Sequence, residues 1–426
     1  MLDQADEGSL PEEVGPRVVQ LVVRGCKATG RELGQLLIVS SAKLRALDAS
    51  CNRLGDETGE GMEELAKCGC LTDLEELDLS GNVLTDVCVV PLSRLPQPMT
   101  LLRRLSLSSN NLTVDGARLL AAALKRCVAL TELSVAKNRR LGDAGAALLC
   151  HHFRENLAIV ALDFGCCGLT AECASAFAGL LEETSVLQAL DLHGNNLSVR
   201  GAQALAKGLA ANASLTWLNV ADNSFTGSGA ELALSASSAS DGVGVLADAL
   251  TKTSSLLMVN VSGNSVTKHA MGTLSKCLAS NRSLCRLILS EGDCAHMLAP
   301  KHLPNSLVSM SEEGRDEHLP PSLQKRLREN GAAIGAFDGF VQAGDQVRVF
   351  KNIFFPLFSC SPSDSCVGAA DVWREPGACG CRGQHGAAHG GAQGSWRKSC
   401  GCDSAECVWI AVVAQPPRHH AAGAGV

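Results

Sequence analysis

Apolar and polar positions along this chain follow one phrase that returns about every 28 residues. In each eleven-residue phrase, leucine-like residues take the first, fourth, sixth and last positions, and asparagine takes the ninth, as in 74–84, 102–112, 187–197 and 215–225. The phrase begins ten times, at Val18, Leu44, Leu74, Leu102, Leu130, Ile159, Leu187, Leu215, Leu256 and Leu284. Successive starts lie 26–30 residues apart, apart from one interval of 41. Ten matches at nearly constant spacing indicate an array of internal repeats.

Two different periodicities alternate within each unit. Apolar and exposed positions alternate in the first half, which is the pattern of a short strand. In the second half, Ala117, Leu120, Ala121 and Leu124 follow i, i+3, i+4, i+7 spacing, which predicts a helix with one apolar stripe. Strands joined by helical crossovers must be parallel. The pattern therefore predicts an α/β solenoid with one strand and one helix in each unit.

The ninth position carries a polar side chain that is expected to turn the chain and to satisfy backbone groups of neighbouring units. It is occupied by Asn52, Asn82, Asn110, Asn138, Asn195, Asn223 and Asn264, with Cys26 and Cys167 in the equivalent place. These residues predict a ladder of side chains along the solenoid.

The phrase L-x-x-L-x-L-x-x-N/C-x-L resembles that of leucine-rich repeats. The unit length resembles the ribonuclease-inhibitor-like class, which also occurs in the sensor regions of NOD-like receptors and in the Ran GTPase-activating protein. The resemblance covers roughly residues 18–294. It implies a right-handed horseshoe of about ten repeats, with a parallel sheet on the concave side and helices on the convex side. Such a solenoid offers a long concave surface for another macromolecule, so the resemblance implies a protein-binding scaffold or sensor.

The chain divides into four predicted regions: a polar lead-in at 1–17, the repeats at 18–294, a capping segment at 295–345 and a tail at 346–426. The longest unit contains an insertion near 229–241, and a short helix near 322–330 is the candidate cap for the last repeat. Six of the ten Phe lie between Phe337 and Phe358. Two interpretations of this segment remain open: it docks on the solenoid, or it binds a partner. The rest of the tail is rich in Cys and Gly without periodicity, and we expect it to be largely disordered.

Composition narrows the class of partner. At 426 residues and 46% apolar content, the chain can bury a long continuous core. No apolar run is long enough to span a membrane, and the acidic N-terminus lacks a secretory signal pattern. We therefore expect a cytoplasmic or nuclear location and no membrane partner. A net charge of -7 and only 3% aromatic residues argue against nucleic acid as the partner, so we expect a protein ligand. We also expect the chain to be monomeric.

The 20 Cys fall into two groups. Thirteen lie at or before Cys294, mostly inside repeats, where a reduced Cys acts as a small apolar residue. The tail could supply zinc ligands from Cys379, Cys381, Cys400, Cys402 and Cys407. Their C-x-C spacing departs from the usual C-x₂₋₄-C pairs, and a tail without metal is the simpler interpretation. We expect no cofactor.

No catalytic motif stands out: the P-loop, the G-x-S-x-G elbow and H-E-x-x-H are missing from the sequence. We therefore expect no enzymatic activity. Two alternatives to a scaffold remain open. One is GTPase activation, as in the Ran activator, although the acidic run typical of that family after its repeats is missing. The other is inhibition of a basic ribonuclease-like enzyme, although the dense aromatic contacts of that family are largely absent.

The candidate binding face consists of the positions two, four and six residues after each start, because these point away from the core. Its candidate contact residues are Glu76, Asp78, Arg104, Glu132, Asp163, Asp191, His193, Trp217, Asn219 and Met258. Aspartates and amides predominate four residues after the starts, either as a contact surface or as a feature of the repeat class itself. An exposed Trp217 beside Met258 is typical of a binding anchor.

Overall fold

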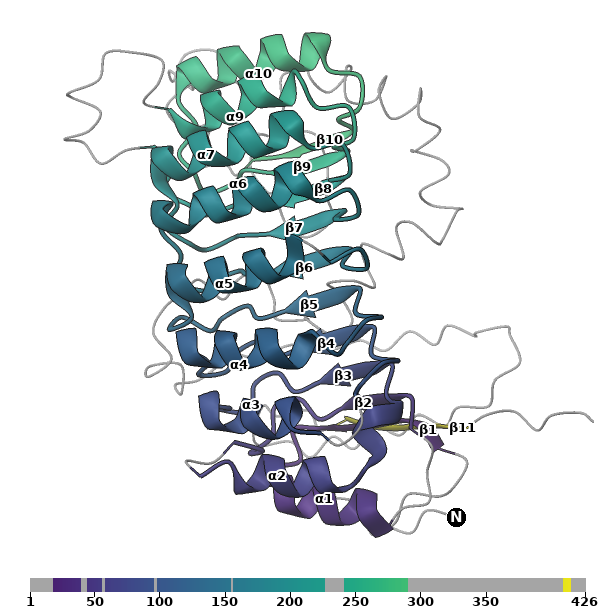
Figure 1. The fold of residues 1–426 in the computed structure, drawn as a ribbon. Helices are drawn as coiled ribbons and strands as arrows, with labels where there is room; N and C mark the ends of the chain where they lie inside the picture. Colours follow the sequence, from purple (N-terminus) through teal and green to yellow (C-terminus); the bar gives the residue numbers. More distant parts are fainter. Residues whose placement is uncertain are drawn as a thin grey trace, which may run out of the picture.

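The computed structural model describes residues 18–39, 44–55, 58–95, 98–154, 156–226, 241–289 and 409–414. Most of them form a stack of strand–helix units, with the strands on one side and the helices on the other (Figure 1). Several predicted features lie outside the described residues: the lead-in at 1–17, the insertion near 229–241 apart from Asp241, the capping helix near 322–330 and the Phe-containing segment.

The strands are short and evenly spaced, and they form one sheet. Its parallel strands are β1 (Val18–Arg24), β2 (Ala46–Asp48), β3 (Glu76–Asp78), β4 (Arg104–Ser106), β5 (Glu132–Ser134), β6 (Ala161–Asp163), β7 (Ala189–Asp191), β8 (Trp217–Asn219), β9 (Met258–Asn260) and β10 (Arg286–Ile288). Each pairs in parallel with the next, in sequence order. The predicted α/β leucine-rich repeat solenoid with ten repeat strands is therefore confirmed.

The helices line the opposite side of the sheet (Figure 1). They are α1 (Gly30–Val39), α2 (Glu60–Lys67), α3 (Asp86–Ser93), α4 (Val114–Leu124), α5 (Gly142–Arg154), α6 (Ala174–Glu183), α7 (Ser198–Ala211), α9 (Gly242–Leu250) and α10 (Lys268–Ser280), with the 3₁₀ turns η1 (Cys70–Asp73) and η2 (Ala171–Cys173). In α4 the predicted stripe packs against the core through the buried Ala117, Leu120 and Leu124. Small residues in this stripe bring helix and sheet close together.

The ladder predicted at the ninth position is present. The Nδ2 of Asn110 donates to the carbonyl oxygens of Leu79 and Leu107, both at 3.0 Å. Its Oδ1 accepts the backbone N–H groups of Asn82 at 3.0 Å and Leu84 at 2.9 Å. One side chain thus joins two consecutive units, which explains why a short polar residue returns at this position.

Cysteine takes the place of asparagine once in the middle of the ladder. The Cys167 thiol donates to the carbonyl of Val135 at 3.2 Å, and the Cys167 N–H donates to Oδ1 of Asn195 at 3.0 Å. A thiol can supply the bond to the preceding unit, so Cys167 acts as the substitute that the sequence predicts.

The strand β11 (Trp409–Ala414) is a feature that we did not predict. It pairs antiparallel with β1, from Val18 opposite Ala414 to Arg24 opposite Trp409. β1 begins the parallel series, so its outer edge offers unpaired backbone groups to another strand. The apolar, partly β-branched segment 409–414 suits that position. The remainder of the tail, predicted to be largely disordered, lies outside the described residues.

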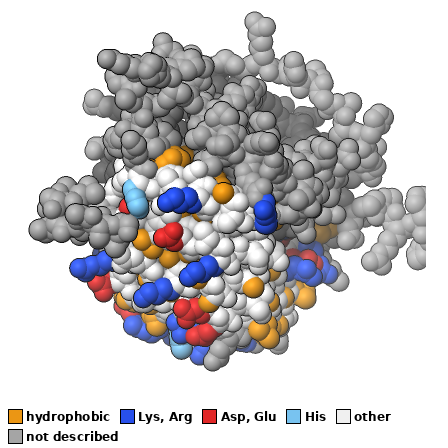
Figure 2. Space-filling model, turned by 90° about the horizontal axis from the view of Figure 1, so that it is seen from above, with side chains coloured by type: hydrophobic (Ala, Val, Ile, Leu, Met, Phe, Trp, Pro, Cys, Tyr) orange, Lys and Arg blue, Asp and Glu red, His pale blue; other side chains and the backbone are white. Residues whose placement is uncertain are grey.

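The helices of the described part are all too short or too polar to cross a membrane. On the part of the described surface visible from the C-terminal end of the stack, basic and acidic side chains are interspersed (Figure 2). This distribution differs from the basic patch of one sign that is typical of a nucleic-acid-binding surface.

Candidate protein-binding face

Three rows of side chains cross the sheet, because the parallel strands place equivalent positions side by side. The first row contains the first residue of each strand, and from β3 to β9 it reads Glu76, Arg104, Glu132, Ala161, Ala189, Trp217 and Met258. The second row contains the last residue of each strand and reads Asp78, Ser106, Ser134, Asp163, Asp191, Asn219 and Asn260. The third row lies two residues further on and includes Gly165 and His193. All ten predicted contact residues belong to these rows.

The first row is charged over β3 to β5. Arg104 pairs with Oε1 of Glu76 at 2.9 Å and with Oε1 of Glu132 at 3.1 Å. Burial raises the pKa of Glu132, and the neighbouring Arg104 opposes that shift. Because two carboxylates share one guanidinium, this part of the row keeps one net negative charge. Arg104 is engaged within the row, which limits what it can offer to a partner.

Over β6 to β9 the first row is apolar. Ala161 and Ala189 are buried and short, whereas Trp217 and Met258 are half-buried and large. Ala189 lies opposite Trp217, and Trp217 lies opposite Met258 in the parallel register. The row therefore presents a large aromatic side chain between a thioether and a surface of methyl groups, an arrangement suited to apolar contact.

Three of the candidate contact residues lie buried in the second row. They are Asp78, Asp163 and Asp191. Their carboxylates accept the backbone N–H two residues further on at 2.8–2.9 Å. The amide of Asn219 does the same at 3.2 Å. Each short side chain folds onto the turn that follows its own strand. The second row thus stabilises the repeats themselves.

Burial has a cost for these carboxylates. Burial, with a further contribution from the charge of Asp48, raises the pKa of Asp78 to about 6. Burial, followed by the charge of Asp191, raises the pKa of Asp163 to about 6 as well. A carboxyl group with a raised pKa in the folded protein destabilises the fold when it ionises.

Asp78→Asn is therefore expected to stabilise the protein by about 1–2 kcal/mol at pH 8. The amide keeps an oxygen for the N–H of Ser80 and removes a buried charge, as asparagine already does in β8 and β9. The wild-type protein loses stability as the pH rises from about 4 to about 6, because the folded state holds the proton more tightly. Urea unfolding at pH 8 and below pH 4 measures the gain, which should vanish at the acidic pH. Asp48→Asn, at a half-buried position, is the control and should change less.

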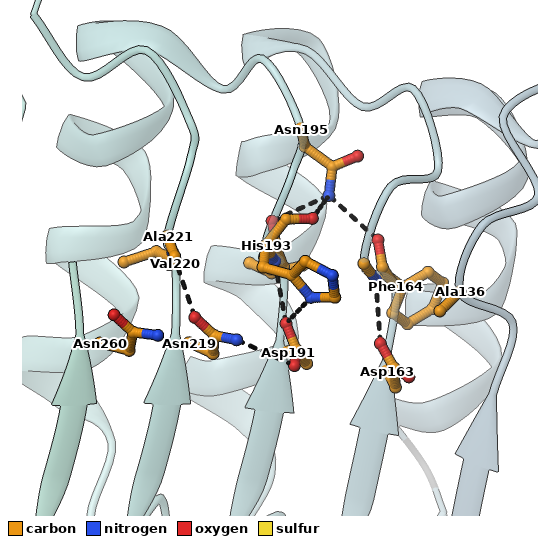
Figure 3. Close-up of polar contacts among 12 residues, drawn as sticks. Ala136, Asp163, Phe164, Asp191, His193, Asn195, Asn219, Val220, Ala221 and Asn260 are labelled. Carbon is orange, nitrogen blue, oxygen red and sulfur yellow. Dashed lines mark hydrogen bonds and ion pairs between the residues drawn. The ribbon is translucent and has the colours of Figure 1, made fainter. Parts of the chain in front are cut away.

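His193 joins two units at the centre of the face (Figure 3). Its Nδ1 lies 2.7 Å from Oδ1 of Asp191, whose Oδ2 accepts Nδ2 of Asn219 at 3.0 Å. Burial would lower the pKa of His193, but the charge and hydrogen bond of Asp191, with smaller contributions from Cys166 and the charge of Asp163, raise it to about 12. His193 is therefore an imidazolium at neutral pH that offsets two neighbouring carboxylates. The repeat pattern gives His193 a strand position, but the residue lies in the turn after β7.

Gly165 makes room for this ring. A Cβ at position 165 would lie 2.2 Å from Cε1 of His193, well inside contact distance. A glycine in the third row of one unit and a histidine in the third row of the next therefore form a matched pair. The repeat spacing places positions 165 and 193 in neighbouring units, but it does not show that the His193 ring lies over Gly165.

Asp163, Asp191 and His193 are also the group, among the described residues, whose side chains could together hold a metal ion. Their potential ligand atoms all lie within 4.8 Å of one another. The carboxylates already accept protein donors, and His193 serves as their cation. The geometry is fully accounted for by hydrogen bonds and charge. The zinc candidates predicted in the tail, Cys379, Cys381, Cys400, Cys402 and Cys407, lie outside the described residues.

Comparisons with known proteins agree with the repeat architecture. A family model described as "Leucine Rich repeat" matches residues 70–93, 99–121, 127–150 and 185–206. Ribonuclease inhibitor from Sus scrofa is 34% identical over 188 residues, which cover 43% of this chain and 40% of that protein. NACHT, LRR and PYD domains-containing protein 3 from Macaca mulatta is 33% identical over 208 residues, 41% of this chain and 19% of that protein. Protein 12 of the same series from Mus musculus is 37% identical over 138 residues, 32% of this chain and 13% of that protein.

The chain thus spans two fifths or less of the length of these relatives. Among solved structures, the actin-binding site 2 of leiomodin-1 aligns with 51% of this chain and 89% of that chain, at 13% identity and a TM-score of 0.30, too low for any argument about function. The parallel strand–helix units, the asparagine ladder and the matching repeats show a leucine-rich repeat solenoid that is similar to ribonuclease-inhibitor-like proteins.

Proposed function

We propose that this protein is a non-enzymatic scaffold or sensor that holds a protein ligand against its sheet face. The observation that carries the proposal is the apolar part of the first row, where the half-buried Trp217 stands between Met258 and the buried Ala189. A large aromatic residue with a rigid, well-packed base is the side chain that most often dominates binding energy at protein interfaces.

The chemistry of the rows suggests the kind of ligand. Trp217 and Met258 suit an apolar side chain of the ligand, while Glu76 and Glu132, with one net negative charge after pairing with Arg104, suit a Lys or Arg nearby. The second row contributes little, because its aspartates are buried and bonded to their own turns. The ligand expected on this face is a protein surface with an apolar centre and a basic flank.

Trp217→Ala is expected to weaken binding by about 2 kcal/mol, close to 30-fold in Kd, because truncation removes the main apolar contact. The ligand would be captured from the native cells with the wild-type chain, identified, purified and titrated against each variant. Lys125→Ala and Lys207→Ala, on exposed positions of the helical side, serve as matched controls and should bind as the wild type does. If the helix variants lose binding and Trp217→Ala does not, the ligand binds elsewhere and the proposal fails.

Charge should be tested at Glu76 rather than in the second row. A lysine at Asp163 or Asp191 would enter a buried site and unfold the turn, whereas the Glu76 side chain is 38% exposed. Glu76→Gln is expected to slow association at low salt and to leave the dissociation rate nearly unchanged, since an exposed charge acts mainly through steering.

Inhibition of a basic ribonuclease-like enzyme is the second candidate, and the 34% identity to porcine ribonuclease inhibitor favours it. It would be tested by titrating the protein into a pancreatic-type ribonuclease assay. If a stoichiometric amount of the wild-type protein abolishes the ribonuclease activity and the Trp217→Ala variant does not, the scaffold acts as a ribonuclease inhibitor. Stimulated GTP hydrolysis by a Ran-type GTPase would instead support the activator alternative.

A further inference from the structure

Cys68 and Cys70 form a thiol pair that the binding face does not use. They flank Gly69 in the connection between α2 and β3, and their Sγ atoms lie 2.8 Å apart. Of the twelve cysteines in the described residues, nine are buried, Cys51 is exposed, and Cys68 and Cys70 are half-buried. The pair therefore combines two properties that the buried cysteines lack: access for a small reagent and a second thiol in contact.

The local backbone holds the two side chains together. Cys68 ends α2, with its N–H bonded to the carbonyl of Leu65, and Cys70 begins η1. Gly69 between them has φ +75°, a conformation that glycine adopts without strain. A Cβ at position 69 would meet nothing within 4 Å, so the turn itself, rather than space, favours glycine here. The buried Leu71 and Leu74 anchor the segment that follows.

The two thiols differ in acidity. The hydrogen bond from the Cys70 thiol, against the opposing effect of burial, lowers the pKa of Cys68, and backbone bonds from Cys70 and Leu71 act in the same direction. The same contact, together with burial, raises the pKa of Cys70 well above its usual range. A thiol with a lowered pKa and some exposure is the one that attacks a disulfide first.

We propose that Cys68 and Cys70 are a reversible dithiol–disulfide pair, oxidised by small disulfides of the glutathione type. The Cys68 thiolate attacks one sulfur of glutathione disulfide, forming a mixed disulfide and releasing one glutathione thiolate, which takes up the proton that Cys68 lost. Cys70 then loses its proton and attacks the sulfur of Cys68, forming the Cys68–Cys70 bond and releasing the second glutathione. Two protein thiols are oxidised, and one glutathione disulfide is reduced to two glutathione molecules.

Oxidation should leave the solenoid folded. A disulfide requires the two sulfurs to approach by less than about 1 Å from their present separation. Both residues belong to the same connection, so no strand or helix of another unit has to move. The redox change is therefore confined to the entry to β3, the strand that begins with Glu76.

The test uses the full chain, reduced and then exposed to glutathione disulfide. After an acid quench, unfolding and alkylation of the remaining thiols, cleavage after Glu64 and Glu75 releases peptide 65–75, which contains these two cysteines alone. Mass spectrometry is expected to find this peptide unalkylated and lighter by two hydrogen atoms. Added dithiothreitol should restore both alkylation sites.

Three variants separate the steps. Cys70→Ser should stop at the mixed disulfide, so that its peptide is heavier by one glutathione. In Cys68→Ser, we expect the remaining thiol to react about tenfold more slowly, since burial still raises the pKa of Cys70. Cys51→Ser, at an exposed cysteine outside the pair, should leave the oxidation of peptide 65–75 unchanged.

Two results would overturn the proposal. One is a wild-type peptide 65–75 that keeps both thiols, or a glutathione adduct that persists on it. The other is oxidation of the buried Cys127 and Cys150 at the same rate, accompanied by loss of the far-UV circular dichroism signal, because the disulfide would then follow from unfolding.

Discussion

Asn110→Ala is expected to lower the free energy of unfolding by about 3 kcal/mol, because one amide satisfies backbone groups in two consecutive units. Alanine would leave the N–H groups of Asn82 and Leu84 without their acceptor, and the carbonyl of Leu79 would lose its donor. Asn110 is 5% exposed, so water cannot readily replace these bonds. Each unsatisfied buried group costs about 1–3 kcal/mol. Because the surrounding structure relaxes partly, we expect the total loss to be about 3 kcal/mol rather than the full sum over all the groups.

The adjacent Asn111 provides the matched control. Its side chain is exposed, and its backbone N–H bond to the carbonyl of Leu84 survives replacement by alanine. Asn111→Ala should therefore change stability by less than about 0.5 kcal/mol. Urea unfolding followed by circular dichroism compares the two. If Asn110→Ala and Asn111→Ala unfold with the same free energy, the side-chain hydrogen bonds of Asn110 do not stabilise the protein as we expect.

His193→Gln is expected to destabilise the protein by about 2–3 kcal/mol near pH 6.5, because it removes the cation between Asp163 and Asp191. Removing one partner of a buried ion pair typically costs about 3–5 kcal/mol, and the 33% exposure of the His193 side chain reduces that figure. Glutamine retains a donor for Asp191, so the loss reports charge more than hydrogen bonding.

The pH dependence of this loss has a definite shape. The pKa of His193 is raised to about 12, so its stabilisation is complete below its ordinary pKa of about 6.5 and diminishes as the pH rises toward about 12. The loss should also shrink as the pH falls below about 6, where Asp163 takes up a proton and no longer needs the cation. Unfolding free energies measured from pH 4 to pH 9 should therefore show the largest difference from wild type near pH 6.5.

A second substitution tests the cause. Asp163→Asn keeps an oxygen for the N–H of Gly165 and removes one of the two carboxylates. Combined with His193→Gln, it should restore at least half of the lost stability, because the net charge of the cluster returns to that of the wild type. Equal losses in the single and double variants would attribute the effect of His193 to packing over Gly165 instead.

The local pattern of the sequence determined the repeating part of this protein. Period-two alternation located the strands, period-3.6 stripes located the helices, and the constant spacing of Asn82, Asn110 and Asn138 gave the register between units. In a solenoid each unit contacts mainly its neighbours, so a pattern that is local in the sequence is also local in space. The same reasoning placed Trp217 and Met258 together on one face, because equal positions in consecutive units become adjacent.

Burial and ionisation were decided by the tertiary structure. The sequence shows that Asp78 and Asp163 point away from the core, but neighbouring strands and their own turns bury them and raise their pKa values. The position of His193 over Gly165 depends on side-chain directions that the repeat pattern does not contain. The pairing of β11 with β1 joins segments nearly 400 residues apart, without any shared period. Desolvation and long-range contacts arise only once the chain has folded, so these features could not be derived from local periodicity.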